Sequence, residues 1–410
     1  MNTLRRLLRH GDFRWLWLGQ SLSEVGNRMI AIVVTLYVVK LTGSTGDVGI
    51  VLSAQAGALT LLLLLGGVVA DRLPRRRVMI GADLARVAVQ GIIAILAFTG
   101  GLSIWLLAVL VAGTGAAAAF FEPAYRGLLP QTVPEDMIQE ALTLTQVSRN
   151  VALFGGSALG TGLALGPGFG WAYLVDAATF LASAGLLVFV RARVRGSIAE
   201  LPAKEPLRRS LVDGLAEVRS RAWVWVTMLW ALIFLFACLA PYFAVGAVVS
   251  RDRYGTSAVF GWLEAAAGAG ALFGVFLGFR WRPRRPMQSA MMTPFIWTVA
   301  IALFSLGVST WVVIPLMAIG GSLFTLFGLW WQTSLAAFIP PHAISRVSSI
   351  SWVAGGALMP VGFVLAGFLG DHIAPTTVLT CGCIIGAVAT AAALSAPGLR
   401  ALRAGPVTAT

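Results

Sequence analysis

Charged and polar side chains interrupt several long apolar runs of this sequence, and they are the residues best placed to do chemistry. Glu24, Asn27 and Arg28 have spacings of three and four residues, so they share one face of a helix. Glu264 is the only acid inside the apolar runs of the second half. A carboxylate there can take up and release a proton, because burial disfavours its charged form. We rank Glu264 first as a proton carrier and Glu24 second, since Arg28 favours ionised Glu24.

A second group of polar residues could bind a substrate. Arg149 and Asn150 lie near the middle of an apolar run, and no acid lies one helical turn from Arg149. An unpaired arginine in the membrane requires a partner on another helix or an anionic ligand. The candidate substrate-binding residues are Asn27, Arg28, Arg149, Asn150 and Gln332.

Each of these residues also has a structural interpretation, which the sequence leaves open. Glu24 and Arg28 could simply neutralise each other, and Arg149 could extend its charge toward the membrane surface. Glu264 could form a structural hydrogen bond with a neighbouring helix. A charge at mid-membrane costs about 2.5–3.5 kcal/mol on an insertion scale, so each must have a partner or a function.

The apolar runs are the elements that must position these side chains. Of the 410 residues, 58% are hydrophobic and 11% are charged, whereas soluble proteins have about 25% charged residues. A membrane-spanning helix needs about 20 apolar residues. We therefore expect an all-α membrane protein with twelve transmembrane helices. The expected spans are 13–40, 47–70, 78–99, 103–128, 138–165, 169–190, 223–250, 257–279, 287–308, 311–335, 347–370 and 376–396.

The basic residues predict how the chain crosses the membrane. The net charge is +13, and the excess falls in alternate loops, whereas the other loops hold only Lys40, Arg251 and Arg253. The positive-inside rule then places both termini in the cytoplasm. The positive charge indicates contact with anionic lipid rather than with nucleic acid. We expect a multi-pass protein of a bacterial inner membrane.

One long charged connection divides the chain. Within residues 191–222, Leu207, Leu211, Leu215 and Val218 recur at helical spacing, which predicts an amphipathic helix on the cytoplasmic face. The expected domains are an N-terminal six-helix bundle (1–190), a cytoplasmic linker (191–222) and a C-terminal six-helix bundle (223–410).

The two bundles are expected to be pseudo-symmetric. The segment DRLPRRRVM (71–79) corresponds to RWRPRRPMQ (280–288) at an offset of 209 residues, and LLPQTVP (128–134) corresponds to FIPPHAI (338–344) at a similar offset. Two matches in corresponding loops indicate a duplicated unit. Secondary transporters are often built this way, with the substrate site between the repeats.

The sequence resembles the major facilitator superfamily. The stretch GGVVADRLPRRR (66–77) is similar to the superfamily signature between the second and third helices. The segments FRWLWLGQSLSEVGNRM (13–29), ADLAR (82–86) and WAYLVDAATFLAS (171–183) resemble the branch of enterobactin exporters and macrolide-efflux proteins. The resemblance covers the whole chain and implies transport by alternating access.

The resemblance also implies a conformational latch. In the superfamily this loop lies beside the start of the eleventh helix, where Ser345 is the expected N-cap. A helix dipole favours a carboxylate near its N-terminus by roughly 0.3–1 kcal/mol, so Asp71 could hold the halves together in one conformation. The alternative is that the arginines only set the topology. The latch residues are Asp71, Arg72, Arg75 and Arg76.

The expected function is export of an amphiphilic small molecule of the antibiotic or siderophore class by proton antiport. The expected partners are this substrate, protons and membrane lipid, and we expect a monomer. The sequence has no Walker motif, which argues against ATP as the energy source. The scattered residues His10, His342 and His372 predict no metal site. We expect no cofactor and no enzymatic activity. Two alternatives remain open, namely an importer of the same fold and a non-transporting membrane sensor or assembly factor.

Overall fold

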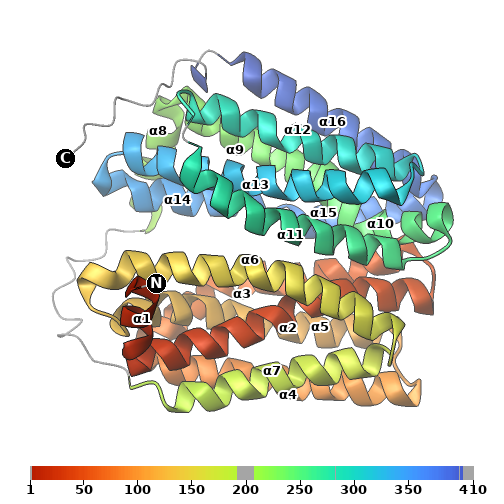
Figure 1. Cartoon of the computed structure of the whole chain (residues 1–410), viewed down its shortest axis with the longest axis horizontal. Coiled ribbons are helices and arrows are strands. Elements are labelled where there is room, and N and C mark those ends of the chain that lie inside the picture. Colours follow the sequence, from red (N-terminus) through yellow and green to blue (C-terminus); the bar gives the residue numbers. More distant parts are fainter. Residues whose placement is uncertain (1, 192–206, 282, 397, 400–410) are drawn as a thin grey trace.

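The regular elements of the structure are helices (Figure 1). The computed structural model describes residues 2–191, 207–281, 283–396 and 398–399, and these residues form no strand. The first part of the chain contains α1 (Asn2–Arg9), α2 (Gly11–Leu41), α3 (Thr45–Arg72), α4 (Arg75–Thr99), α5 (Ile104–Leu128), η1 (Leu129–Gln131), η2 (Glu135–Met137), α6 (Ile138–Leu165) and α7 (Phe169–Val188). The second part contains α8 (Leu207–Ser220), α9 (Ala222–Phe234), η4 (Leu235–Leu239), α10 (Ala240–Tyr254), α11 (Ala258–Arg280), α12 (Pro286–Ser305), α13 (Thr310–Phe338), α14 (Pro341–Gly356), α15 (Met359–His372) and α16 (Pro375–Ser395).

The predicted twelve membrane crossings can be followed in these helices. Within the described residues, 10 helical stretches are long and apolar enough to span a membrane, and one of them joins α9, η4 and α10. The more polar helix α6, with 28 residues, provides another crossing. The pair α14–α15, interrupted between Gly356 and Met359, provides the last. The expected all-α membrane fold is confirmed.

Local sequence explains several helix ends. The Ser44 hydroxyl accepts a hydrogen bond from the Asp47 amide at the start of α3, at 3.0 Å, which is a standard N-cap interaction. At the other end of a helix, Gly100 follows α4 with a φ of 74°. Glycine tolerates this left-handed conformation, which ends the helix and starts a short turn.

The two six-helix bundles repeat the same helix pairs. In the first bundle α3 packs along α5, and α4 packs against α7. In the second bundle α11 packs along α13, and α12 packs against α16. Figure 1 shows the first bundle below the second, with the helices of both running along the long axis of the molecule. This correspondence agrees with the 209-residue repeat in the sequence.

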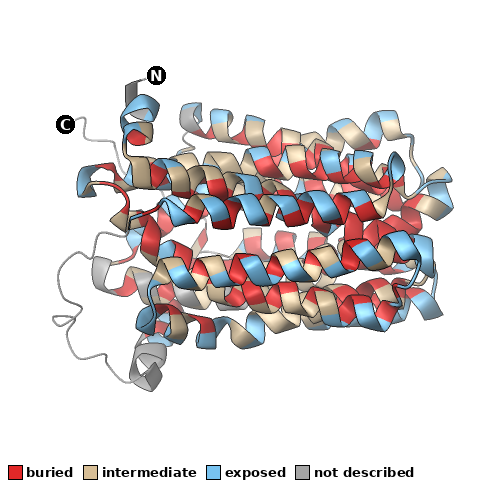
Figure 2. Cartoon of the chain, turned by 90° about the horizontal axis from the view of Figure 1, so that it is seen from below, coloured by how far each residue is buried: buried red, intermediate tan, exposed pale blue. Residues whose placement is uncertain are grey.

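Apolar side chains cover much of the outer surface. Leu61 is 79% exposed and Trp311 is 88% exposed. Figure 2 shows exposed positions along the outward faces of the helices, with buried positions between them. Large apolar exposure is uncommon in soluble proteins, and it is expected where lipid surrounds the protein.

The bundles contact each other toward one end of the molecule. We call the end where the N-terminal helix lies, at the left of Figure 1, the terminal end, and the other the opposite end. At the opposite end α15 packs against the start of α3, and nearer the middle α11 packs along α6. Gly268 of α11 lies against the backbone of Phe154 in α6, and a Cβ atom there would collide with it. The glycine therefore permits close contact between the bundles.

Two crossings of the second bundle are irregular. The π-helical segment η4 separates α9 from α10 and is followed directly by Ala240 and Pro241. Proline cannot donate a backbone hydrogen bond, so it favours such a local rearrangement.

Helix α8 packs against α14 through Gly214, which lies beside Ile350. It occupies the place of the predicted amphipathic helix, whereas residues 192–206 of the predicted linker lie outside the described residues.

Candidate functional site

One face of α2 is free of packing within its own bundle. Gly26 of this helix contacts α7, and Met29 contacts α6. The remaining face carries Glu24, Asn27 and Arg28, of which Asn27 and Arg28 are exposed. Of the predicted polar residues, Asn27 and Arg28 therefore reach open space, whereas Glu24 is buried against its own bundle.

Glu24 and Arg28 form an ion pair on this face. The Arg28 Nε and Nη2 atoms donate hydrogen bonds to Oε1 of Glu24 at 3.0 and 2.9 Å. The Glu24 side chain is nearly buried, whereas 44% of the Arg28 side chain is exposed. The ion pair engages the Glu24 carboxylate and leaves part of the Arg28 guanidinium accessible.

Glu264 lies across the bundle interface from this pair. It is only 5% exposed, and the charge of Arg28 from the other bundle acts on its carboxylate. The Tyr242 hydroxyl is close enough to interact with the carboxylate, yet neither Oε1 of Glu264 nor the Tyr242 hydroxyl has a well-oriented hydrogen-bond partner within the described residues. The structure thus places both predicted proton-carrier residues near Arg28, one from each bundle.

Arg149 has the partner on another helix that the sequence required. Its Nη2 atom lies 3.3 Å from Oε1 of Glu122 on α5, and Glu122 also pairs with Arg126 at 3.6 Å. The Tyr125 ring lies 6.0 Å from the guanidinium. Within the described residues the Nε atom of Arg149 has no hydrogen-bond partner, so the guanidinium keeps one donor for a ligand.

The last two substrate candidates occupy different places. Asn150 follows Arg149 and is half-buried on α6. Gln332 is exposed on α13, next to Trp331, whose ring packs 5.7 Å from Trp223 toward the terminal end. Glu264 lies toward the opposite end, so the structure does not bring Gln332 to it.

Two of the latch arginines bind within their own bundle. The Arg75 Nη1 atom donates a hydrogen bond to the carbonyl of Gly127 at the end of α5. The Arg76 Nη1 atom donates to the carbonyl of Val190 after α7, at 3.0 Å. These hydrogen bonds attach the loop between α3 and α4 to the first bundle.

Asp71 and Arg72 end α3 at the terminal end. Oδ1 of Asp71 lies 4.0 Å from Nη2 of Arg75, and Arg72 is exposed. Helix α14 begins at Pro341, so the prediction that Ser345 is its N-cap is wrong. Proline is well suited to the first helical position because its missing amide would have no partner there, and the helix therefore starts before the serine.

An interaction that the sequence analysis did not identify joins the bundles at the opposite end. Asp371, in the last turn of α15, accepts hydrogen bonds from the amide and the hydroxyl of Thr45, both at 2.8 Å. It also accepts one from the Ser44 hydroxyl at 2.8 Å and one from the Gly46 amide at 3.1 Å. The carboxylate thus caps the N-terminus of α3 from the other bundle.

Asp371 lies beyond the predicted span 347–370. Partial burial opposes its ionisation, but the hydrogen bonds from Ser44, Thr45 and Gly46 outweigh burial and hold the pKa of Asp371 below its usual value. The sequence contains a signal for this residue. Asp371 and His372 lie shortly before Pro375, as Asp71 and Arg72 lie shortly before Pro74.

Another charged pair of the first bundle is structural. Asp83 lies 3.6 Å from Arg86, and both are buried. The Ser183 hydroxyl donates to Asp83 at 2.7 Å, and the Arg86 guanidinium lies 5.0 Å from the rings of Phe121 and Phe180. These residues pack against one another inside the first bundle, although Oδ1 of Asp83 has no hydrogen-bond partner within the described residues.

The sequence has relatives among exporters. The profile of the family described as "Transmembrane secretion effector" matches residues 6–405. Macrolide efflux protein A of Streptococcus pyogenes is 24% identical over 387 residues, covering 88% of this chain and 90% of that protein. Enterobactin exporter EntS of Shigella flexneri is 27% identical over 393 residues, covering 91% and 88%.

Solved transporter structures share the fold. A bacterial homologue of the human lysosomal transporter Spinster, in an inward-facing and unoccupied conformation, superimposes with a TM-score of 0.70 at 15% identity, covering 96% of this chain and 98% of that chain. A bacterial homologue of the iron transporter ferroportin gives 0.67 at 17% identity, covering 95% and 100%. On the match over residues 6–405, this chain belongs to the transmembrane secretion effector family of the major facilitator superfamily.

Proposed function

We propose that this transporter exports an amphiphilic small molecule of the antibiotic or siderophore class in exchange for protons. The terminal end faces the cytoplasm of a bacterial cell, in accordance with the distribution of basic residues. The named activities of macrolide efflux protein A and enterobactin exporter EntS support export and this substrate class.

The observation that carries the proposal is the position of Glu264. Its carboxylate is buried, and one of its oxygens lacks a hydrogen-bond partner within the described residues. It faces Arg28 from the other bundle. A buried acid at a moving interface can exchange a proton with alternate sides of the membrane as its surroundings change. Glu24 is less suited because its carboxylate is already engaged in a direct ion pair with Arg28 on the same helix.

Alternating access would proceed by movement of the two bundles, residues 1–190 and 223–410, around this interface. Helix α3 runs antiparallel to the α14–α15 pair, so closure of the bundles at the terminal end would bring Asp71, near the end of α3, toward the N-terminus of α14. Asp371 caps α3 at the opposite end in this structure. Asp71 is the corresponding acid at the terminal end and is the proposed latch there, together with Arg72, Arg75 and Arg76.

Transport into everted membrane vesicles tests the proposal directly. An acidic vesicle interior should drive uptake of radiolabelled erythromycin or enterobactin, and a protonophore should abolish it. Uptake by intact cells but not by everted vesicles would instead establish the importer alternative. Absence of proton-driven flux of both compounds would contradict the proposed substrate class and favour a non-transporting sensor.

The proposed latch predicts a defect in transport without a defect in insertion. Asp71→Asn should reach the membrane at the wild-type level but transport roughly fivefold more slowly, because losing about 1 kcal/mol of charge interaction with a helix N-terminus shifts one conformational equilibrium. Expression and vesicle flux would be measured together. The control is Asp136→Asn, which removes an acid that is 72% exposed at the same end. Wild-type flux from a well-expressed Asp71→Asn protein would refute the latch.

The Arg149 site predicts a graded response. Arg149→Lys keeps the charge but loses the planar fork of donors, so the apparent KM should rise several-fold. Arg149→Ala should lose nearly all transport, because it removes both the free Nε donor and a partner of half-buried Glu122. Arg126→Ala, which removes the more exposed partner of Glu122, is the matched control. Equal flux of wild type and Arg149→Ala would assign Arg149 a structural role.

A further inference from the structure

Three consecutive helices of the second bundle bury polar atoms that have no hydrogen-bond partner within the described residues. These atoms are the hydroxyl of Tyr242 on α10, Oε1 of Glu264 on α11 and Nε1 of Trp297 on α12. The three residues are 0%, 5% and 8% exposed. A buried polar group without a partner costs about 1–3 kcal/mol, so three of them from adjacent helices require an explanation.

The three side chains lie in one region of the bundle. The Tyr242 ring packs 5.2 Å from the ring of Phe260, one turn before Glu264, and its hydroxyl interacts with the Glu264 carboxylate. One turn before Tyr242, Cys238 contacts Thr298, the residue after Trp297. This contact joins the two segments that carry Tyr242 and Trp297.

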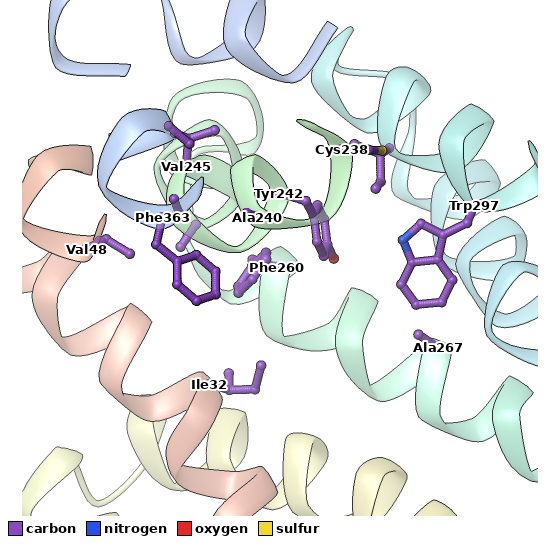
Figure 3. Packing of buried hydrophobic residues seen from close by; sticks show 14 of the residues in the cluster. Ile32, Val48, Cys238, Ala240, Tyr242, Val245, Phe260, Ala267, Trp297 and Phe363 are labelled. Atoms are coloured by element: carbon purple, nitrogen blue, oxygen red, sulfur yellow. The ribbon is translucent and has the colours of Figure 1, made fainter. Parts of the chain in front are cut away.

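Figure 3 shows how these side chains point. In this view the nitrogen-bearing edge of Trp297 faces the side on which Tyr242 lies, the Tyr242 hydroxyl points downward, and Ala267, three residues after Glu264, lies below Trp297. The π-helical segment η4 ends three residues before Tyr242, and such segments often occur at functional sites.

Elsewhere in the second bundle, one indole and one phenol do have hydrogen-bond acceptors. Nε1 of Trp230 donates to the Thr390 hydroxyl at 2.9 Å. The Tyr254 hydroxyl donates to the carbonyl of Val308 at 2.7 Å. The second bundle therefore can provide internal acceptors for its indoles and phenols, whereas in the first bundle the hydroxyl of buried Tyr173 also has no partner within the described residues.

We propose that Tyr242, Glu264 and Trp297 form a binding subsite for a hydroxyl or carbonyl oxygen on an otherwise apolar, uncharged part of the substrate. The subsite rests on the proposed export function and defines which chemistry it recognises. Tyr242 and Trp297 donate to the substrate oxygen, and Glu264 accepts from a substrate hydroxyl. Phe260 and Phe304 pack against the Tyr242 ring and surround these groups with apolar surface.

The donor set disfavours charged ligands. A cation would pair with Glu264 but would leave the indole N–H of Trp297 without an acceptor. An anion would be repelled by the Glu264 carboxylate. A neutral hydroxyl fits best because it can donate one hydrogen bond and accept two.

The same geometry couples binding of the substrate to protonation of Glu264. A substrate hydroxyl that donates to Glu264 stabilises the ionised carboxylate, whereas protonation of Glu264 removes its charge and turns one of its two acceptor oxygens into a donor. Substrate and proton therefore compete for one group. A proton arriving from outside weakens binding of the substrate there, and its release to the cytoplasm restores the stronger binding, which gives exchange in the direction of export.

Conservative removal of the two donors tests the subsite. Tyr242→Phe and Trp297→Phe would be purified, and binding of radiolabelled erythromycin, which carries several hydroxyl groups on an apolar ring, would be measured at equilibrium. Loss of one hydrogen bond, worth about 0.5–1.5 kcal/mol, should raise the Kd about 3–10-fold in each variant. The nearly isosteric Tyr242→Phe keeps the test valid if Trp297→Phe folds poorly.

Matched controls repeat the substitutions elsewhere. Tyr254→Phe and Trp311→Phe remove a phenol and an exposed indole away from Glu264, and their Kd values should stay within about twofold of wild type. Tetraphenylphosphonium, a lipophilic cation without oxygen, should compete poorly. Unchanged Kd values in both subsite variants, or strong competition by tetraphenylphosphonium, would overturn the proposal while leaving export intact. Failure of wild-type vesicles to transport either compound would instead refute the proposed function.

Discussion

Glu264→Gln is expected to abolish export driven by a pH gradient, lowering its rate at least 100-fold, while substrate counterflow continues. Glutamine has the shape of a protonated glutamate but cannot release a proton. The variant should therefore complete the substrate-exchanging half of the cycle and fail at the proton-carrying half. Proteoliposomes with an imposed pH gradient measure the first activity, and preloaded proteoliposomes without a gradient measure the second.

Glu24→Gln is the decisive comparison for this prediction. Glu24 is paired with Arg28 at 2.9 Å, so its loss should unpair Arg28 and weaken substrate binding while proton-driven flux persists at saturating substrate. If instead the Glu264→Gln variant exported like wild type under a pH gradient, Glu264 would be excluded as the carrier. Glu24 would then be the remaining candidate.

The fold could be predicted from the sequence because the bilayer imposes a simple rule on chain composition. Each crossing requires a run of about 20 apolar residues, and the expected span 138–165 coincides with α6 (Ile138–Leu165). The break between α14 and α15 could not be seen in this way, since the run 347–370 remains apolar through Gly356 and Pro360. Hydropathy reports the surroundings of a helix, whereas a local interruption depends on tertiary contacts.

The candidate site could be predicted only in part. Pairs on one helix, such as Glu24 with Arg28, follow from helical periodicity and are present. The partner of Arg149 could not be predicted, because Glu122 lies on another helix and 27 residues away. Trp297 gave no signal either, since an indole inside an apolar run resembles any packing residue until its hydrogen-bonding surroundings are known.

Asp371→Ala is expected to open the opposite end of the molecule. The carboxylate accepts hydrogen bonds from Ser44, Thr45 and Gly46 across the bundle interface. Hydrogen bonds to a charged group contribute about 1.5–3 kcal/mol, which corresponds to a shift of roughly 10–100-fold in a two-state population. Removal of the carboxylate should therefore increase the fraction of molecules in which the bundles separate at this end.

Spin labels can measure this separation. Gly101→Cys and Ser309→Cys, introduced after replacement of Cys238, Cys381 and Cys383, place one label on each bundle in loops at the opposite end. Their distance distribution should gain a longer component in Asp371→Ala. Asp47→Asn is the control, because Asp47 lies in the same first turn of α3 but belongs to that helix.

The pH dependence separates this contact from the proton carrier. The hydrogen bonds keep the pKa of Asp371 below its usual value, about 3.9 for aspartate. A carboxylate with a lowered pKa contributes its stabilisation above the ordinary pKa and loses it only when the pH falls through the lowered value. The contact should therefore persist between about pH 5 and pH 8. Any shift of the distance distribution across that range should remain in Asp371→Ala and disappear in Glu264→Gln. A shift that disappeared with Asp371 instead would make this outer contact, rather than the buried acid, the group that senses the proton.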